Sequence, residues 1–242
     1  MHLDILAFGA HPDDIELSCG GSLAAMIGKG YTVGICDLTR GELGSRGTAE
    51  TRALEAEKAS AILGIHERIN LGIPDGDISV NNEYILEIVA VLRHYTPRII
   101  LIPAHKDRHL DHEYAHQLLR KSVFMSGMTK IETMYHGITQ NPYRPKYMFS
   151  YMQSYHFEPD FIVDISEHFS TKIQAIQAYS TQVYVEGQHD DNAPQTFIST
   201  PAFMTMLTAR SQYLGSLIGA SYGEGFKTIE PLGISGFDIW MQ

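Results

Sequence analysis

The sequence predicts an α/β fold in which a Rossmann-like, mostly parallel sheet is flanked by helices. Three observations support this prediction: short apolar segments alternate with helical patterns over residues 3–102, glycines or capping residues separate them, and polar clusters follow two of the apolar segments. Alternating strands and helices favour parallel strands that are joined by right-handed crossovers. At 242 residues, the chain is expected to form a single domain, residues 1–242, around one core.

The first apolar segment, Leu3 to Gly9, is typical of a strand that is covered on both faces. A helix is expected after it up to Lys29, where Gly30 provides a stop. The same signals, with Thr48 and Asn81-Asn82 as caps, predict strands at Tyr31 to Leu38, Arg68 to Leu71 and Arg98 to Ile102, and helices at Thr48 to Leu63 and Glu83 to Tyr95.

The pattern is less regular beyond Ser126. We expect strands near residues 131–136, 146–152 and 161–165, and helices near 170–181 and 201–218. Residues 185–196 are rich in Gly, Asp, Asn, Gln and Pro, a composition that is typical of an exposed loop or a mobile lid.

Composition and charge exclude several classes of protein. With 44% hydrophobic and 19% charged residues, the chain has the composition of a folded globular protein. Its formal net charge of −10 disfavours nucleic acid as a partner, because a phosphate backbone would be repelled. There is no signal-peptide pattern, no long apolar run and only 2 cysteines. We therefore expect a cytoplasmic protein that binds neither nucleic acid nor membranes.

Two polar clusters lie at or just beyond the carboxyl ends of predicted strands. The first is His11-Pro12-Asp13-Asp14 and the second is His109-Leu110-Asp111-His112. Parallel α/β sheets bind ligands beyond the carboxyl ends of their strands, so both clusters are expected at one edge. Two imidazoles and one carboxylate would leave a coordination position for water, as in catalytic zinc sites. The predicted metal ligands are His11, Asp14 and His112.

The clusters also contain a spare acid and a spare base. Asp13 adjoins a predicted ligand and is the candidate general base that takes a proton from the attacking water. His109, if protonated, could stabilise an oxyanion and then protonate the departing amine. Asp111 is the candidate that orients the His109 ring and favours its charged form.

Each cluster alone has a simpler interpretation. A His-Pro-Asp sequence is common in turns, and Asp14 or Asp111 could merely cap the helix that it begins. The occurrence of a full ligand set at two strand ends favours a shared metal site instead. The other histidines lack a comparable carboxylate-rich surrounding.

Arg52 shares a predicted helix face with the apolar positions Ala56, Ala59 and Leu63. An inward-facing arginine requires an anion, either a substrate group or a structural partner such as Glu42 or Asp75. Glycines at 41, 44 and 47 surround Glu42 and Arg46, which is suitable for close approach to a ligand or simply for a connecting loop.

The two clusters resemble the motifs of the LmbE-like, or PIG-L-type, zinc N-deacetylases. Ala10-His11-Pro12-Asp13-Asp14-Ile15-Glu16 is similar to the opening motif of that family, and His109-Leu110-Asp111-His112 is similar to its His-x-Asp-His motif. The resemblance implies zinc ligands at His11, Asp14 and His112, a base at Asp13 and an oxyanion-stabilising group at His109. It also implies a Rossmann-like sheet without dinucleotide binding.

Within that family the chain resembles most the deacetylases of bacillithiol biosynthesis, which convert N-acetylglucosaminyl malate to glucosaminyl malate. The resemblance extends to segments 41–48, 70–76 and 222–226. It implies a homo-oligomer, trimer or hexamer, by analogy. The candidate substrate-binding residues are Arg52, Glu42, Arg46, Asp75 and Arg108, and three of these, Arg52, Arg46 and Arg108, are candidates for reading malate.

We therefore predict a zinc-dependent hydrolase that acts on the acetamide of an N-acetylglucosaminide, with Fe²⁺, Mn²⁺ or Co²⁺ as alternative metals. Two rival functions remain at this point. Two histidines and a carboxylate also form the facial triad of non-haem Fe(II) oxygenases, and an α/β crevice can serve a non-catalytic module that binds a sugar or nucleotide. The spare base beside a ligand favours hydrolysis.

Overall fold

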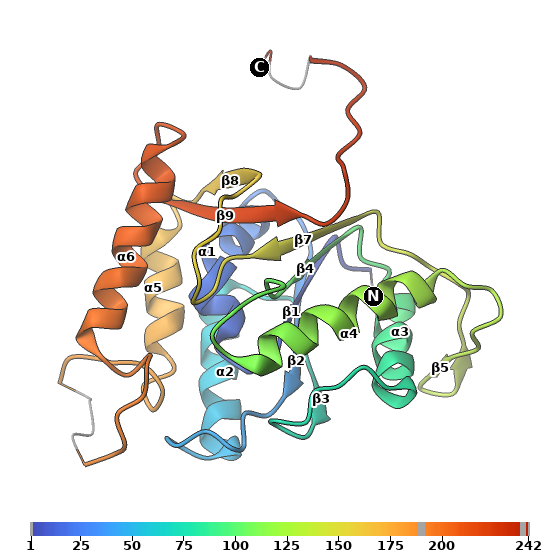
Figure 1. Cartoon of the computed structure of the whole chain (residues 1–242), viewed down its shortest axis with the longest axis horizontal. Helices are drawn as coiled ribbons and strands as arrows, with labels where there is room; N and C mark the ends of the chain where they lie inside the picture. Colours follow the sequence, from blue (N-terminus) through green and yellow to red (C-terminus); the bar gives the residue numbers. More distant parts are fainter. Residues whose placement is uncertain (1, 188–191, 238–240, 242) are drawn as a thin grey trace.

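A computed structural model describes residues 2–187, 192–237 and 241 of the chain (Figure 1). Its centre is a seven-stranded sheet in the order β3-β2-β1-β4-β7-β9-β8. The strands are β1 (Ile5–Gly9), β2 (Val33–Thr39), β3 (Glu67–Ile73), β4 (Ile99–Ile102), β7 (Tyr147–Tyr151), β8 (Phe161–Asp164) and β9 (Gly223–Thr228). The strands β3, β2, β1, β4 and β7 are parallel, whereas β9 is antiparallel to both of its neighbours, so the predicted mostly parallel α/β fold is confirmed.

Helices cover both faces of the sheet. They are α1 (Asp14–Gly28), α2 (Ala49–Leu63), α3 (Asn82–Tyr95), α4 (Leu110–Ser126), α5 (Phe169–Gln177) and α6 (Pro201–Ser216). Figure 1 shows α3 and α4 on one face, and α1, α2 and α5 on the other. Because side chains alternate along a strand, Leu6 and Phe8 of β1 join the core beneath α3 and α4, while Ile5 and Ala7 pack beneath α1.

Helix ends form where the sequence indicates them. The Thr48 hydroxyl accepts a hydrogen bond from the Thr51 amide at 3.2 Å, and the Asn81 side chain accepts one from the Tyr84 amide at 3.0 Å. Gly64 ends α2 with φ = 77°, a left-handed conformation that glycine adopts without steric cost. These caps confirm the predicted starts of α2 and α3.

Strand order determines where the site lies. β1 pairs with β2 on one side and with β4 on the other, so the chain runs outward in both directions from this point. In open α/β sheets such a reversal of strand order leaves a crevice beyond the carboxyl ends of the strands. The polar segments that follow β1 and β4 therefore face each other across adjacent strands.

The second half of the chain departs from the sequence prediction. Residues 131–136 do not join the main sheet, because only β5 (Met134–Tyr135) forms there and it pairs with β6 (Ile138–Thr139) in a separate hairpin. The strand β9, with the sequence GEGFKT, was not predicted. Its glycines and charged residues have low strand propensity, and pairing with β7 and β8 on both sides overrides that preference.

Two further expectations concern an exposed loop and membrane-spanning helices. The predicted loop at 185–196 includes residues 188–191, which lie outside the described residues. Within the described part of the chain, no helix is long and apolar enough to span a membrane.

Candidate metal centre

The His11-Pro12-Asp13-Asp14 segment forms a tight turn between β1 and α1. Asp14 Oδ2 accepts a hydrogen bond from the His11 amide at 2.9 Å. Asp13 has φ = 114°, which lies in the left-handed region that residues with a side chain rarely adopt. Backbone strain of this kind costs about 1–3 kcal/mol and is concentrated at functional sites. The strained turn brings both Asp13 and Asp14 to the wall of one cavity.

The ligand set predicted from the sequence converges. His11, Asp14 and His112 each offer a ligand atom, and these three atoms lie within 4.8 Å of one another. His112 Nε2 lies 3.2 Å from Asp14 Oδ1, and His11 Nδ1 lies 3.7 Å from Asp14 Oδ2. All three residues are buried. Two imidazoles and one carboxylate form the donor set of a catalytic zinc site.

Carboxylates orient both histidines through the ring nitrogens that face away from this centre. His11 Nε2 lies 3.0 Å from Asp75 Oδ1 and 3.3 Å from Asp111 Oδ2. His112 Nδ1 lies 3.1 Å from Asp107 Oδ1. Metal-binding histidines usually donate the N–H of their other ring nitrogen to a hydrogen-bond acceptor such as a carboxylate. This contact holds the ring and raises its basicity.

Electrostatics at this centre favour a cation. Burial lowers the pKa of His112, but the carboxylates of Asp14 and Asp107 outweigh it and raise the pKa to about 9. Burial likewise raises the pKa of Asp14, but the charge of His112 and hydrogen bonds from His11 and His112 hold it well below its usual range. The surrounding carboxylates thus keep the histidines protonated, and a metal ion would replace those protons. The residues present therefore fit a divalent metal.

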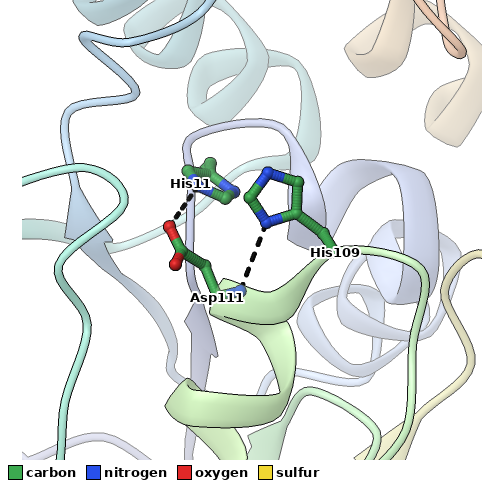
Figure 2. Close-up of side chains that lie close together, drawn as sticks. All are labelled: His11, His109 and Asp111. Atoms are coloured by element: carbon green, nitrogen blue, oxygen red, sulfur yellow. Dashed lines mark hydrogen bonds and ion pairs between the residues drawn. The ribbon is translucent and has the colours of Figure 1, made fainter.

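A second group of three residues, His11, His109 and Asp111, shares one histidine with the first (Figure 2). The Asp111 carboxylate is already engaged, because Oδ2 accepts from the Gly76 amide at 3.0 Å and contacts His11. Asp111 also does not line the adjacent cavity, whereas His11, Asp14 and His112 all do. The set His11, Asp14 and His112 is therefore the better candidate.

The predicted orientation of His109 by the Asp111 carboxylate is wrong. His109 is the N-cap of α4, and its Nδ1 accepts a hydrogen bond from the Asp111 backbone amide at 3.3 Å (Figure 2). The Asp111 side chain instead turns towards His11 and the Gly76 turn, where it meets a donor from another segment of the chain. Because Nδ1 is an acceptor, a neutral His109 ring carries its hydrogen on Nε2.

Asp13 has the surroundings of a general base. Its Oδ2 is buried and has no hydrogen-bond partner among the described residues. Burial raises the pKa of Asp13 to about 7, although the positive charge of Arg52, whose Nη2 lies 3.7 Å away, opposes the shift. A base with a pKa near neutrality can accept a proton and later return it.

Arg52 points inward, as its helix face predicts, and its partner is Asp13. The alternative partners that the sequence left open, Glu42 and Asp75, form no ion pair with Arg52 in the described structure; instead Arg52 Nη2 also donates to the Gln182 side chain. Gly41 allows this arrangement, because a Cβ at this position would overlap the guanidinium of Arg52. This glycine accommodates an arginine of the same chain and does not itself line the cavity.

A cavity of about 640 Å³ opens over the centre. Three of the predicted substrate-binding residues, Arg52, Asp75 and Arg108, line it. The other two, Glu42 and Arg46, do not line the cavity. Their side chains instead form hydrogen bonds to the backbone of neighbouring loops. Glu42 Oε1 accepts from the Asp75 amide at 3.1 Å, while Arg46 donates to the carbonyl oxygens of Thr181 and Pro194 at 2.8 and 3.0 Å.

Three residues at the site were missed by sequence reasoning. Asp107, two positions before His109, accepts backbone hydrogen bonds from Ser154 and Tyr155 besides contacting His112. Gln153, beyond the end of β7, donates to Asp14 Oδ1 at 2.8 Å, and Arg210 of α6 lines the cavity. The sequence carries a signal only for Asp107, which lies in the same polar segment as the second cluster.

Fold and site together place the chain among α/β proteins with a two-histidine, one-carboxylate centre at the carboxyl edge of the sheet. Residues 6–123 match the family described as PIG-L, GlcNAc-PI de-N-acetylase. The structure of the conserved protein TT1542 from Thermus thermophilus is similar at 35% identity, with a TM-score of 0.85 and coverage of 97% of this chain and 98% of that one. The chain belongs to the PIG-L family.

Two curated relatives are deacetylases by name. The diacetylchitobiose deacetylase of Thermococcus kodakarensis is 27% identical over 235 residues, which is 93% of this chain and 82% of the relative. The uncharacterized deacetylase YaiS of Escherichia coli is 36% identical over 119 residues, which is 47% of this chain. That match spans 64% of the length of YaiS.

Proposed function

We propose that the chain is a metal-dependent N-deacetylase with zinc as its cation. Its substrate is an N-acetylglucosaminide, specifically N-acetyl-D-glucosaminyl L-malate, and its products are glucosaminyl malate and acetate. One observation carries the proposal: Asp13 lines the same cavity as the converging set His11, Asp14 and His112, and its buried Oδ2 accepts no hydrogen bond among the described residues, with the Arg52 guanidinium 3.7 Å away. Ligand residues alone would serve storage or structure, whereas an adjacent free base is what hydrolysis requires.

The residues of this chain provide the proton transfers. A divalent cation held by His11, Asp14 and His112 would supply Lewis-acid polarisation of the acetamide carbonyl and of water. Asp13 accepts the proton of the attacking water as oxygen adds to the carbonyl carbon. When the carbon–nitrogen bond breaks, the protonated Asp13 gives that proton to the amine. The free amine and acetic acid leave, and acetic acid loses the second proton of the water to solvent to give acetate.

His109 stabilises the oxygen of the tetrahedral intermediate. Its Nδ1 accepts the Asp111 amide, which leaves Nε2–H as the available donor without any added charge. The pKa of His109 is lowered, first by burial and then by the positive charges of His11 and His112. A neutral His109 is an adequate hydrogen-bond donor but a weak acid. In this mechanism Asp13, and not His109, therefore protonates the departing amine.

Support for the amino-sugar substrate comes from the family and from the cavity. The PIG-L description and the name of the Thermococcus kodakarensis relative both refer to N-acetylglucosamine units. The cavity volume of about 640 Å³ lies within the range of small-molecule sites. The malate group is proposed because segments 41–48, 70–76 and 222–226 resemble those of bacillithiol-type deacetylases and because Arg108 offers a cation at the cavity wall.

The test is acetate release from purified protein in metal-free and zinc-loaded form. The substrates are N-acetylglucosaminyl malate, diacetylchitobiose and N-acetylglucosamine, and each reaction is run with and without oxygen. We expect zinc-dependent acetate release that is fastest from the malate conjugate and independent of oxygen. Oxygen-dependent turnover would show that the chain is an oxygenase. Glycan binding without acetate release would show that it is a non-catalytic binding module. His112→Gln, which removes one ligand, is the matched negative control.

A further inference from the structure

Arg210 is a cation in the cavity wall that the described part of the chain leaves nearly unpartnered. It lies on α6, and its Nη1 donates to the backbone carbonyl of Gln153. Among the described residues no carboxylate lies within ion-pair distance of its guanidinium. Burial lowers the pKa of Arg210, and the more distant charges of Glu224 and Asp107 do not offset this effect. A guanidinium has five N–H donors, so most of its capacity is free.

Three further buried or partly buried cations in the described part of the chain have their partners. Arg68 forms ion pairs with Glu16 at 2.6 Å and Asp37 at 2.8 Å, and Lys172 pairs with Glu224 at 2.5 Å. Arg93, which has no acidic partner in the described structure, donates to four oxygens. An unpaired buried charge is costly, and a cation left this way beside a cavity is a site for an anion.

A second arginine, Arg108, lines the same cavity. The guanidinium of Arg108 stacks over the ring of Phe197 at 4.6 Å, and within the described ranges it also has no acidic partner. Phe197 in turn contacts Phe203 edge-to-face at 5.3 Å between ring centroids. Phe203 and Arg210 are seven positions apart on α6 and therefore share one face of that helix. Both arginines thus flank one aromatic wall of the same cavity.

The location relative to the metal centre suits a substituent on the sugar. Gln153 contacts both regions, because its Nε2 donates to Asp14 Oδ1 and its carbonyl oxygen accepts from Arg210. In an N-acetylglucosaminide the acetamide is on C2 and the aglycone is on the adjacent C1. An acetamide that reacts beside Asp14 therefore places the aglycone one sugar bond away, near the α6 side of the cavity.

We propose that Arg210 and Arg108 form a subsite that binds the carboxylates of an anionic aglycone on the α6 side of the active-site cavity. This inference rests on the proposed function and deepens it. Two separate guanidinium groups match a dicarboxylate better than a single phosphate, because each can bind one carboxylate with paired N–H donors. The Phe197 ring stacks against the guanidinium of Arg108 and restricts its position at the cavity wall.

The first test compares kcat/KM of zinc-loaded wild-type protein and Arg210→Gln for N-acetylglucosaminyl malate and for neutral diacetylchitobiose. We expect the malate-to-chitobiose ratio to fall about 10- to 100-fold, mainly through KM, as for the loss of a charge-assisted hydrogen bond. Arg210→Lys should recover part of the ratio. Arg120→Gln, an exposed position on α4, is the matched control and should keep the wild-type ratio.

Equal losses on both substrates would show a structural role for Arg210 and overturn the subsite. A larger loss of kcat/KM on N-acetylglucosamine 1-phosphate than on the malate conjugate would show that the subsite binds a phosphate. That result would also overturn the proposed carboxylate subsite.

The second test needs no turnover. Calorimetric titration of free L-malate into metal-free protein should show binding that Arg210→Gln and Arg108→Gln each weaken about 10-fold or more, on the same scale. Malate binding that is insensitive to both substitutions would contradict the proposal. If the wild-type protein releases no acetate from any substrate but binds malate through these arginines, then the proposed function fails while the subsite stands.

Discussion

The Nζ of Lys172 lies 2.5 Å from Oε1 of Glu224, and this buried ion pair joins the two sides of a break in helix α1. The helix leaves helical geometry at Cys19. Glu224 accepts the freed amides of Gly21 and Ser22 at 3.1 and 2.7 Å, and Lys172 donates to the carbonyl oxygen of Ser18 at 3.3 Å. These bonds satisfy the backbone groups of Ser18, Gly21 and Ser22 at the break and hold the first half of α1, with Asp14 at its start, in place.

Lys172→Met should destabilise the fold because it leaves the Glu224 charge buried without a cation. The expected loss is about 3–5 kcal/mol in the free energy of unfolding, measured by urea denaturation. Adding Glu224→Gln to the same chain should recover part of this loss, because the side-chain amide carries no charge and its oxygen can still accept one of the two helix amides. Additive losses in the double variant would show that the two side chains act independently.

Asp13→Asn tests the base. The amide has the same shape but cannot accept the proton of water, so kcat should fall roughly 10²- to 10⁴-fold. Zinc content, measured by atomic absorption on the purified variant, should match that of the wild type, because Asp13 is outside the ligand set. Turnover close to the wild-type rate would remove Asp13 from the mechanism.

Asp107→Asn tests the carboxylate behind His112. Loss of its charge should weaken zinc binding about 10- to 100-fold, because a neutral amide oxygen accepts from the His112 ring more weakly and no longer raises the basicity of that ring. Competition with a chromophoric chelator measures the dissociation constant directly. Asp77→Asn, which changes an exposed carboxylate elsewhere, is the control and should leave zinc affinity as it is. Equal affinities for wild type and Asp107→Asn would disprove the role.

Removal of the metal should lower thermal stability. Zinc at 100 times its dissociation constant stabilises the folded state by about 2.7 kcal/mol if it does not bind the unfolded chain. For a domain of this size that corresponds to a Tm increase of about 5–10 °C. Differential scanning calorimetry with and without a chelator measures it. His11→Gln combined with His112→Gln should show no zinc-dependent shift; a persisting shift would place the ion elsewhere.

Local patterns in the sequence determined the α/β class, the boundaries of the first helices and the positions of the two polar clusters. Caps such as Thr48 and Asn81 and the alternating apolar segments act within a few residues, so they are legible without the fold. The convergence of His11 with His112 was also predictable, because parallel strands bring their carboxyl ends to one edge.

Only the tertiary structure decided which side chains partner which. In the folded chain the His11 ring contacts Asp75 and Asp111, and the His112 ring contacts Asp107. The Arg52 guanidinium pairs with Asp13. The tertiary structure also paired β9 into the sheet and brought Arg210 to the cavity. These contacts join residues that are far apart in the chain or compete for the same donor, and the geometry of packing rather than any local preference selects among them.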